Sequence, residues 1–333
     1  MFVLPTPPAV VSYLQRTGLT DAAVEALTPD ASDRRYYRVR PLGDSAFVLA
    51  LHAAPFEPGS LPFVNVAALL ALIPLPIPRI RQEVADLGLL VIDDLGDVTL
   101  QAHTHSAPPP VHLPLYEQAI DHLVLLQRRG AVLRHERFLP YQLAFDVEKL
   151  MWEMDFFIRH FLEGFRGATI NAAVRDALRE ELLAIVSALS DEPRVLCHRD
   201  YHSRNLMVTP GGLAVIDFQD ARMGPDTYDL VSLLRDSYVD LNDDFVTHLI
   251  DRFRTARGGA EDLDTFSRRF NLMSVQRNLK ALGTFGYQAV ARANPAYAQY
   301  VPRTLAHVRR TVSIEARCSR LHEILAPLIP ELV

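Results

Sequence analysis

The stretch that decides the fold reads Cys197-His-Arg-Asp200-Tyr-His-Ser-Arg-Asn205-Leu-Met-Val-Thr-Pro-Gly-Gly-Leu-Ala-Val-Ile-Asp217-Phe-Gln-Asp. Two short apolar runs flank Pro210-Gly211-Gly212, a turn signal, so the segment predicts a β-hairpin. Asn205 comes directly before the first predicted strand, and Asp217 comes directly after the second. The hairpin is therefore expected to carry an amide at one end and a carboxylate at the other, both downstream of Asp200.

This combination of polar residues suits one kind of chemistry. An aspartate, an asparagine five residues later and a second aspartate after an apolar strand form a pattern typical of metal-dependent phosphoryl transfer from ATP. In this interpretation Asp200 accepts the proton of an attacking hydroxyl, while Asn205 and Asp217 bind the metal. Mg²⁺ is the expected ion because it prefers hard oxygen ligands. The predicted cofactors are thus ATP and Mg²⁺.

The motifs resemble those of the aminoglycoside phosphotransferase and choline kinase superfamily. Its catalytic segment usually reads His-x-Asp-x-x-x-x-Asn, its metal-binding segment reads Ile-Asp-Phe or Ile-Asp-Trp, and Gly224-Pro-Asp-Thr-Tyr-Asp229-Leu is similar to a third stretch. The resemblance implies that Asp229 is a structural carboxylate that braces the catalytic loop. His198 is also expected to be structural, holding that loop through a backbone hydrogen bond.

Within the superfamily, the wording of the motifs resembles bacterial sugar kinases that phosphorylate the anomeric hydroxyl of N-acetylmuramate and N-acetylglucosamine during cell-wall recycling. Val275-Gln-Arg-Asn-Leu-Lys280 extends this likeness into the last quarter of the chain. The resemblance implies an α+β, protein-kinase-like fold with two lobes. A nucleotide-binding lobe with a small antiparallel sheet is expected over residues 1–95, and a mainly helical lobe with the catalytic loop, metal site and acceptor pocket over residues 97–333.

Local patterns agree with two such lobes. Apolar spacing and alternation predict N-terminal helices over residues 8–17 and 61–73 and strands over 24–27, 35–40, 47–51, 80–83 and 88–92. Amphipathic stretches predict later helices over residues 113–129, 145–163, 171–189, 226–239, 243–256, 262–292 and 295–325. A hinge is expected near residues 91–96, where backbone groups around Ile92 and Asp93 would hydrogen-bond the adenine of ATP.

One departure from the usual kinase pattern concerns the phosphate-binding cation. Kinases of this fold commonly use a lysine on the third strand, but the strand over residues 47–51 has none, and no lysine precedes Lys149. We expect Arg34 or Arg35, with Ser32, to bind the phosphates, because a guanidinium fork matches phosphate oxygens. The alternative is a basic strand edge exposed to water.

Residues that bind the acceptor are expected in the helical lobe, facing the catalytic aspartate. The candidates are Glu153, Arg235, Arg277 and His202, and Asp236 and Lys280 are further ones. Glu153 stands out because carboxylates avoid burial without a partner, and an arginine would suit the lactyl carboxylate of N-acetylmuramate. For the arginines a solvated helix face is the alternative, and His202 could instead brace its loop. Trp152, Phe156 and Phe157 have helical spacing that is more typical of core residues than of a sugar platform.

Composition sets wider bounds. The chain has 333 residues, 49% of them hydrophobic, and a formal net charge of −6, which gives no sign of a nucleic-acid partner. Its two cysteines suit a reducing compartment. No apolar run is long enough for a membrane span, and the proline-broken N-terminus does not read as a signal peptide. We therefore expect a cytoplasmic enzyme whose partner is a small-molecule sugar, and protein partners stay open.

Three functions remain open from the sequence. The first is an ATP-dependent kinase of amino sugars acting at the anomeric hydroxyl. The second is a kinase of another small alcohol, such as an aminoglycoside, choline or homoserine. The third is a nucleotide-binding pseudokinase, which the missing strand lysine permits but which the intact Asp200, Asn205 and Asp217 oppose. ATP turnover separates the third from the others, and acceptor profiling separates the first two.

Overall fold

The computed structural model describes residues 6–27, 34–106 and 109–333. Packing divides the chain into two compact units. Unit 1 comprises Met1–Val98 and Met207–Gln219, and unit 2 comprises Thr99–Leu206 and Asp220–Val333. Each unit is built differently, since unit 1 holds an antiparallel sheet and unit 2 is mainly helical.

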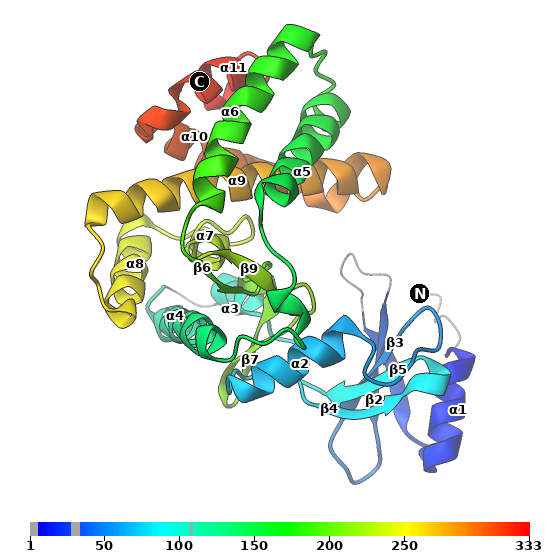
Figure 1. Cartoon of the computed structure of the whole chain (residues 1–333). Helices are drawn as coiled ribbons and strands as arrows, with labels where there is room; N and C mark the ends of the chain where they lie inside the picture. Colours follow the sequence, from blue (N-terminus) through cyan, green and yellow to red (C-terminus); the bar gives the residue numbers. More distant parts are fainter. Residues whose placement is uncertain (1–5, 28–33, 107–108) are drawn as a thin grey trace. The chain divides into compact units, whose positions relative to one another are not determined.

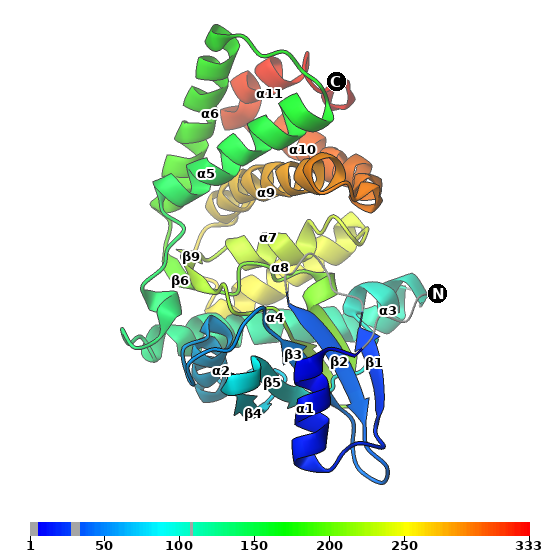
Figure 2. The ribbon, with the colours of Figure 1, turned by 90° about the vertical axis from the view of Figure 1, so that its right-hand side faces the viewer.

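Unit 1 contains a five-stranded antiparallel sheet in the order β1-β2-β3-β5-β4 (Figure 1; Figure 2 also labels β1). Its N-terminal elements are α1 (Pro8–Thr17), β1 (Ala23–Leu27), β2 (Arg35–Arg40), β3 (Phe47–Leu51), α2 (Pro62–Leu72), β4 (Ile80–Val84) and β5 (Leu89–Asp93). The helices and strands predicted for this region are confirmed, several with identical bounds. The alternation of apolar and polar residues determines which side chains of each strand face the core, because successive side chains of a strand point to opposite faces of the sheet.

The core of unit 1 lies between α1 and one face of the sheet. Every second residue on β2, β3 and β5 contributes to it, as the period of a strand requires. Its buried members are Val10, Tyr13, Leu14, Tyr37, Val39, Phe47, Leu49, Leu51, Val84, Leu89 and Val91. Figure 2 shows α1 lying along the sheet. All five residues of β3 are buried and apolar, which leaves no cationic side chain on this strand.

The predicted hairpin is present as β7 (Leu206–Thr209) and β8 (Gly212–Val215). Most of it packs with unit 1, although it is surrounded in the sequence by unit 2. The Val208 N–H donates to the Val98 carbonyl, and the Val215 N–H donates to the Pro76 carbonyl, each over 2.7 Å. The sequence prediction of a helical lobe over residues 97–333 did not anticipate this, and the functional division into lobes stays a prediction.

Unit 2 is mainly helical. Its helices and strands are α3 (Leu100–Ser106), α4 (Pro109–Val132), α5 (Val147–Phe157), α6 (Ala172–Ser190), β6 (Arg194–Cys197), β9 (Arg222–Pro225), α7 (Tyr228–Leu234), α8 (Asp243–Arg257), α9 (Leu263–Gly286), α10 (Val301–Ile314) and α11 (Ser319–Leu325). The single helix predicted over 295–325 was wrong: the backbone at Glu315 is extended and separates α10 from a 3₁₀ turn and α11. The sequence also gave no sign that β6 and β9 pair. Within the described residues, no helix is long and apolar enough to cross a membrane.

Helix α9 runs through the middle of unit 2, where it packs against α5, α7 and α10 (Figure 2). Two glycines allow its close approach to α5 and to the π-helical turn that follows α5. A Cβ on Gly283 would lie 2.9 Å from the Phe157 Cα, and a Cβ on Gly286 would overlap the His160 carbonyl. Real Cβ atoms do not come this close to backbone, so this helix pair depends on both glycines. The crossing sets Glu153 of α5 opposite Gln276 of α9.

Candidate active site

The loop between β6 and β7 is fixed at its start by a buried carboxylate. Asp229, at the beginning of α7, is fully buried and accepts hydrogen bonds from the backbone N–H groups of His198 at 2.6 Å and Arg199 at 2.9 Å. Arg199 has a φ of 87°, which is uncommon for a residue other than glycine. The two bonds to Asp229 hold this strained turn, and so they set the direction of the next residue, Asp200.

A second buried carboxylate fixes the other half of the loop. Asp236 accepts hydrogen bonds from the backbone N–H groups of Ser203 at 2.9 Å and Tyr238 at 2.8 Å. The amide Nδ2 of Asn205 donates to the Asp200 carbonyl over 2.9 Å, which orients the side chain of Asn205. Sequence reasoning offered Asp236 as a further acceptor candidate and not as a brace of this loop. The loop that carries Asp200 and Asn205 is thus held rigidly at both ends.

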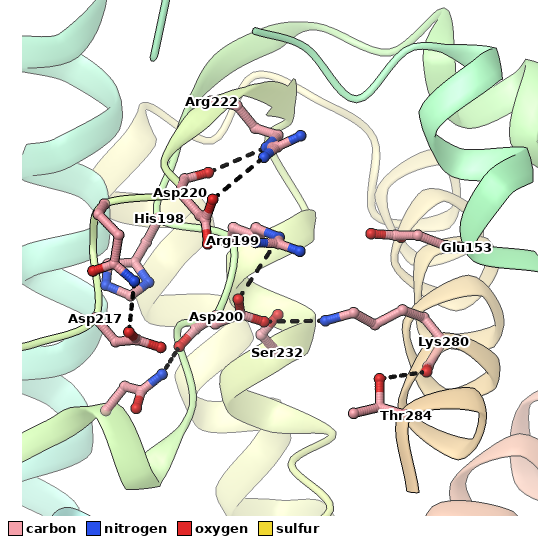
Figure 3. Close-up of polar contacts among 12 residues, drawn as sticks. Glu153, His198, Arg199, Asp200, Asp217, Asp220, Arg222, Ser232, Lys280 and Thr284 are labelled. Carbon is pink, nitrogen blue, oxygen red and sulfur yellow. Dashed lines mark hydrogen bonds and ion pairs between the residues drawn. The ribbon is translucent and has the colours of Figure 1, made fainter. Parts of the chain in front are cut away.

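Asp200 lies among cations contributed by unit 2. Lys280 Nζ of α9 is 3.1 Å from its Oδ1, and Arg199 Nε is 3.7 Å from its Oδ2 (Figure 3). Burial opposes ionisation of this carboxyl, but Lys280, Arg199 and Arg277 outweigh it and hold the pKa of Asp200 well below its usual range. The Asp200 side chain is 22% exposed, so an approaching molecule can reach it. Asp200 is therefore a carboxylate near neutral pH.

Two of the predicted acceptor residues lie beside this carboxylate. Arg277 is buried, donates from Nε to Ser232 Oγ over 2.8 Å and packs over the Tyr228 ring. Glu153 is 1% exposed and accepts a hydrogen bond of 2.8 Å from Gln276. Within the part of the chain that the structure describes, Glu153 Oε1 and Arg277 Nη1 have no hydrogen-bond partner. Unpaired buried polar atoms are uncommon and mark a place where a ligand or water belongs.

The other two acceptor candidates are placed differently. His202 stacks edge-on against Tyr238, and burial, only partly offset by Asp200, lowers the pKa of its ring to about 3, so the ring is neutral. Arg235 follows the last residue of α7 and packs over Phe270. Burial lowers its pKa to about 10, and the charged groups that affect this pKa are Arg310 and Asp243. The structure therefore keeps His202 near Asp200 and does not bring Arg235 there.

The aromatic residues of α5 divide between core and surface. Phe157 is fully buried, as the helical spacing predicted. Trp152 is 54% exposed, so the prediction of a core residue was wrong for it. Its indole stacks on Phe156 with ring centroids 5.3 Å apart, and the Lys149 ammonium lies 4.0 Å above it. One helical turn separates Trp152 from Phe156, which is enough to place them on the same solvent-facing stripe.

Unit 1 brings another set of predicted residues together. Asp217 has a left-handed backbone, with a φ of 61°, and accepts a hydrogen bond of 2.8 Å from Gln219. Arg34 Nη2 lies 3.8 Å from Asp217 Oδ1, and Arg34 also affects the pKa of His52. Arg35 is exposed on β2. The structure thus places Arg34, and not Arg35, beside Asp217, and phosphate binding by either arginine stays a prediction, while Ser32 lies outside the described residues.

Arg79 and Arg81 of unit 1 bind the predicted hinge through Asp93. Ile92 is buried in β5 between β3 and β4, and the Asp93 N–H donates to the Arg79 carbonyl over 3.0 Å. The Asp93 carboxylate accepts from both Arg79 and Arg81 over 2.7 Å. The Asp93 groups are therefore already engaged. Adenine binding near Ile92 and Asp93 stays a prediction. It would have to use groups of this segment other than the Asp93 N–H and the Asp93 carboxylate.

Next to the hinge, Arg38 acts as an internal anchor of unit 1. It is 3% exposed and makes a bidentate contact to Asp94, at 2.7 and 2.9 Å, and a 2.8 Å ion pair with Asp97. The hydrogen bond to Asp94 raises the pKa of Arg38, against the effect of burial, so its charge is permanent. Bidentate arginine pairs fix geometry as well as charge. The segment after β5 is consequently held to β2.

The oxygen ligands fit a magnesium ion better than a transition metal. Within the described ranges, no group of three or more His, Cys, Asp and Glu side chains could hold a metal ion. Mg²⁺ typically binds to one or two protein oxygens and takes its remaining ligands from water and phosphate. The carboxylate of Asp217 and the amide oxygen of Asn205 are donors of this type. The residues present therefore suit a metal that arrives with a nucleotide.

A braced loop with an ionised aspartate, followed by an asparagine and a hairpin ending in a second aspartate, defines the phosphotransferase class. The model of the phosphotransferase enzyme family matches residues 23–266. This match covers most of the chain, and the chain belongs to that family. The α+β, kinase-like fold expected from the sequence is confirmed, and so is the resemblance to aminoglycoside phosphotransferases and choline kinases.

Curated relatives and solved structures agree with this assignment. N-acetylmuramate/N-acetylglucosamine kinase of Neisseria meningitidis is 33% identical over 90% of this chain and 89% of its own length. The enzyme of the same name from Pseudomonas aeruginosa is 32% identical over 90% and 86%. Among solved structures, the gentamicin complex of APH(2″)-IIa has a TM-score of 0.60, 13% identity and coverage of 92% and 97%. A choline/ethanolamine kinase family protein from Mesorhizobium loti has a TM-score of 0.59, 15% identity and coverage of 94% and 99%.

Proposed function

We propose that the protein is an ATP- and Mg²⁺-dependent kinase that phosphorylates the anomeric hydroxyl of N-acetylmuramate and N-acetylglucosamine. Support comes first from the relatives of this name, which align over about nine-tenths of the chain. The observation that carries the proposal is the cationic setting of Asp200, where Lys280 and Arg199 approach the two carboxylate oxygens. This setting keeps Asp200 ionised and ready to receive a hydroxyl.

The geometry suggests how the chain promotes the reaction. The acceptor hydroxyl donates to Asp200, which orients the hydroxyl oxygen toward the γ-phosphorus and takes its proton as the new bond forms and ADP leaves. The low pKa of Asp200 makes it a weak base, so its main contribution is orientation, with proton uptake late in the step. Asn205 and Asp217 would hold Mg²⁺, which neutralises phosphate charge when it is bound.

Charge near Asp200 favours a neutral or anionic acceptor. Lys280 pairs with Asp200, and Arg199 pairs with Asp220. Among the described residues, Arg277 and Glu153 each keep an unpaired polar atom there. Aminoglycosides and choline are cations, and like charges brought together at a buried site cost several kcal/mol. N-acetylmuramate carries a carboxylate, which the unpaired Nη1 of Arg277 could bind. This guanidinium therefore supports a sugar acid as acceptor over the cationic alternatives.

The non-catalytic alternative finds little support. A pseudokinase has no need for an aspartate held by two structural carboxylates, yet Asp229 and Asp236 together accept hydrogen bonds from three backbone N–H groups of the Asp200 loop. Burying charged carboxylates costs free energy. Proteins retain such residues where a functional group has to be positioned to within fractions of an ångström. The braced loop therefore supports a catalytic protein over a pseudokinase. Among enzymes, homoserine and other uncharged or zwitterionic alcohols form the second class of acceptor to be tested.

The test compares acceptors and one isosteric variant. Wild type and Asp200→Asn would be given ATP and Mg²⁺ with N-acetylmuramate, N-acetylglucosamine, homoserine, choline or kanamycin, and phosphorus NMR would locate the new phosphate. We expect anomeric phosphate on the two amino sugars, with kcat lowered by on the order of 10³-fold or more in Asp200→Asn. Transfer to choline or kanamycin instead would contradict the charge argument, and undiminished turnover by the variant would remove Asp200 from the mechanism.

A further inference from the structure

The third strand of unit 1 leaves a gap in the usual charge arrangement. A kinase normally neutralises the phosphates of ATP with metal and a lysine from this strand, but β3 here is entirely buried and apolar. Only two lysines occur in the whole chain, Lys149 and Lys280. The transferred phosphoryl group accumulates negative charge on its oxygens in the transition state, so a cation close to the reacting atoms has a large effect on rate.

Lys280 is the lysine that lies at the reacting centre. It is on α9, and its ammonium points at Asp200 Oδ1 from 3.1 Å (Figure 3). Its side chain is 17% exposed, so the ammonium is sheltered but can still be reached. In the part of the chain that the structure describes, Asp200 is the single hydrogen-bond acceptor for this ammonium. An ammonium has three donors, so two N–H groups remain for another molecule.

We propose that Lys280 is a catalytic residue that binds the phosphoryl group during its transfer, while it keeps Asp200 Oδ1 engaged. The assignment deepens the proposed function and rests on it. In the step concerned, the acceptor oxygen bonds to the γ-phosphorus, the bond from that phosphorus to the ADP oxygen breaks, and the acceptor proton passes to Asp200. Lys280 stays an ammonium throughout and donates hydrogen bonds to the phosphoryl oxygens.

Simple distances show that Lys280 can reach this group. An acceptor hydroxyl that donates to Asp200 lies about 3 Å from the carboxylate, and the phosphorus lies about 3 to 3.5 Å beyond that oxygen before reaction. The phosphoryl group must therefore pass within roughly 6 Å of Asp200, wherever the rest of the nucleotide binds. The Lys280 ammonium already lies within this range, 3.1 Å from Oδ1 of the same carboxylate.

The neighbouring arginines are less suited to this role, because each is held by another partner. Arg199 makes a 2.8 Å ion pair with Asp220. Arg277 donates to Ser232, packs over Tyr228 and is largely buried. Moving either guanidinium toward a phosphate would break those contacts. Lys280 also has a four-carbon stem that can swing by an ångström or two without losing Asp200.

The experiment separates this role from a structural one by kinetics. Lys280→Met preserves the length of the apolar stem and removes the charge. We expect kcat with N-acetylglucosamine to fall by about 10² to 10³-fold, while the KM values for ATP and sugar change less than about threefold. Arg252→Ala is the matched control, because it removes a helix cation from a carboxylate pair with Asp121 elsewhere in unit 2. Its kcat should stay within about twofold of wild type.

Amine rescue provides a readout that a structural role would not move. In Lys280→Ala, added ethylammonium can occupy the vacated space, so kcat should rise saturably by at least about tenfold. Asp200→Asn, which keeps Lys280, should gain nothing. A kcat within threefold of wild type in Lys280→Met, or a loss that follows thermal stability and resists rescue, would overturn the assignment. If wild type phosphorylates neither sugar, the proposed function itself fails, and the role of Lys280 fails with it.

Discussion

Glu192 provides a stability prediction that depends on pH. It follows α6 in unit 2, is 8% exposed and accepts hydrogen bonds of 3.2 Å from Thr227 and Arg269. Burial raises the pKa of this carboxyl to about 7 even though Arg269 opposes the shift, and Asp226 adds to it. Glu261 and Arg257 complete the charged cluster, through Arg269 and Asp226 respectively. Glu192 therefore titrates in the folded protein near neutral pH.

The sign of the effect follows from linkage. An ordinary glutamate has a pKa near 4.5 in the unfolded chain, so between pH 4.5 and 7 the folded protein binds a proton that the unfolded chain has lost. Stability from this group is complete below pH 4.5 and is lost as the pH rises through 7. Between pH 5 and pH 8 the loss amounts to about 2.5 kcal/mol. Glu192→Gln has no proton to lose and removes this dependence.

The assay is urea unfolding of wild type and Glu192→Gln from pH 5 to pH 8, followed by circular dichroism. The difference in unfolding free energy, variant minus wild type, should become more positive by about 2 to 3 kcal/mol across this range. Subtraction cancels every group that titrates equally in both proteins. Asp191→Asn, an exposed neighbour, is the control for the removal of a carboxylate from the surface. A flat or falling difference for Glu192→Gln would show that the ion pair with Arg269 dominates and that the reasoning is wrong.

Two other predictions concern unit 1 and α9. Arg34→Ala should raise the KM for ATP about tenfold, because it loses a charged hydrogen bond to phosphate. Arg35→Ala, at an exposed position, should change this KM less than about twofold. Equal KM values for the two variants in steady-state kinetics would contradict the prediction. Gly286→Ala should destabilise the protein by about 2 kcal/mol, since overpacking of up to about 3 kcal/mol is offset by about 1 kcal/mol of helix propensity. Its control is Gly211→Ala, whose Cβ has an ordinary contact at 3.8 Å, and thermal unfolding that does not separate the two variants would contradict the prediction.

The elements of unit 1 could be predicted closely because their signals are local. The helix Pro8–Thr17 and the strands Arg35–Arg40 and Phe47–Leu51 have the predicted bounds. Apolar alternation fixes such strands, and proline fixes the start of a helix. The long helical pattern over 295–325 misled for the opposite reason. Its apolar spacing continues across Glu315, but the chain turns there so that α10 and α11 can both pack on their neighbours.

The site could be predicted only where residues lie in one motif. Asp200, Asn205 and Asp217 were found through their spacing, and Asp229 through a second short stretch. Lys280 was a candidate for the acceptor site, but its contact with Asp200 joins positions eighty residues apart, and no local pattern signals that contact. The same holds for Asp236, whose two backbone bonds depend on how α7 ends. The exposure of Trp152 was missed because helical periodicity does not tell which face lacks a neighbour.

The missing strand lysine has a physical explanation that does not require loss of catalysis. What phosphoryl transfer needs is positive charge near the reacting oxygens, and a cation has the same effect whichever element carries it. In this chain positive charge gathers around Asp200 from α9 and the catalytic loop, through Lys280, Arg277 and Arg199. Asp229 and Asp236 accept hydrogen bonds from the backbone of the loop and so hold Asp200 in position beside these cations. An apolar β3 buries alternate side chains in the core beside α1, and in the proposed mechanism the charge that β3 lacks is supplied beside Asp200.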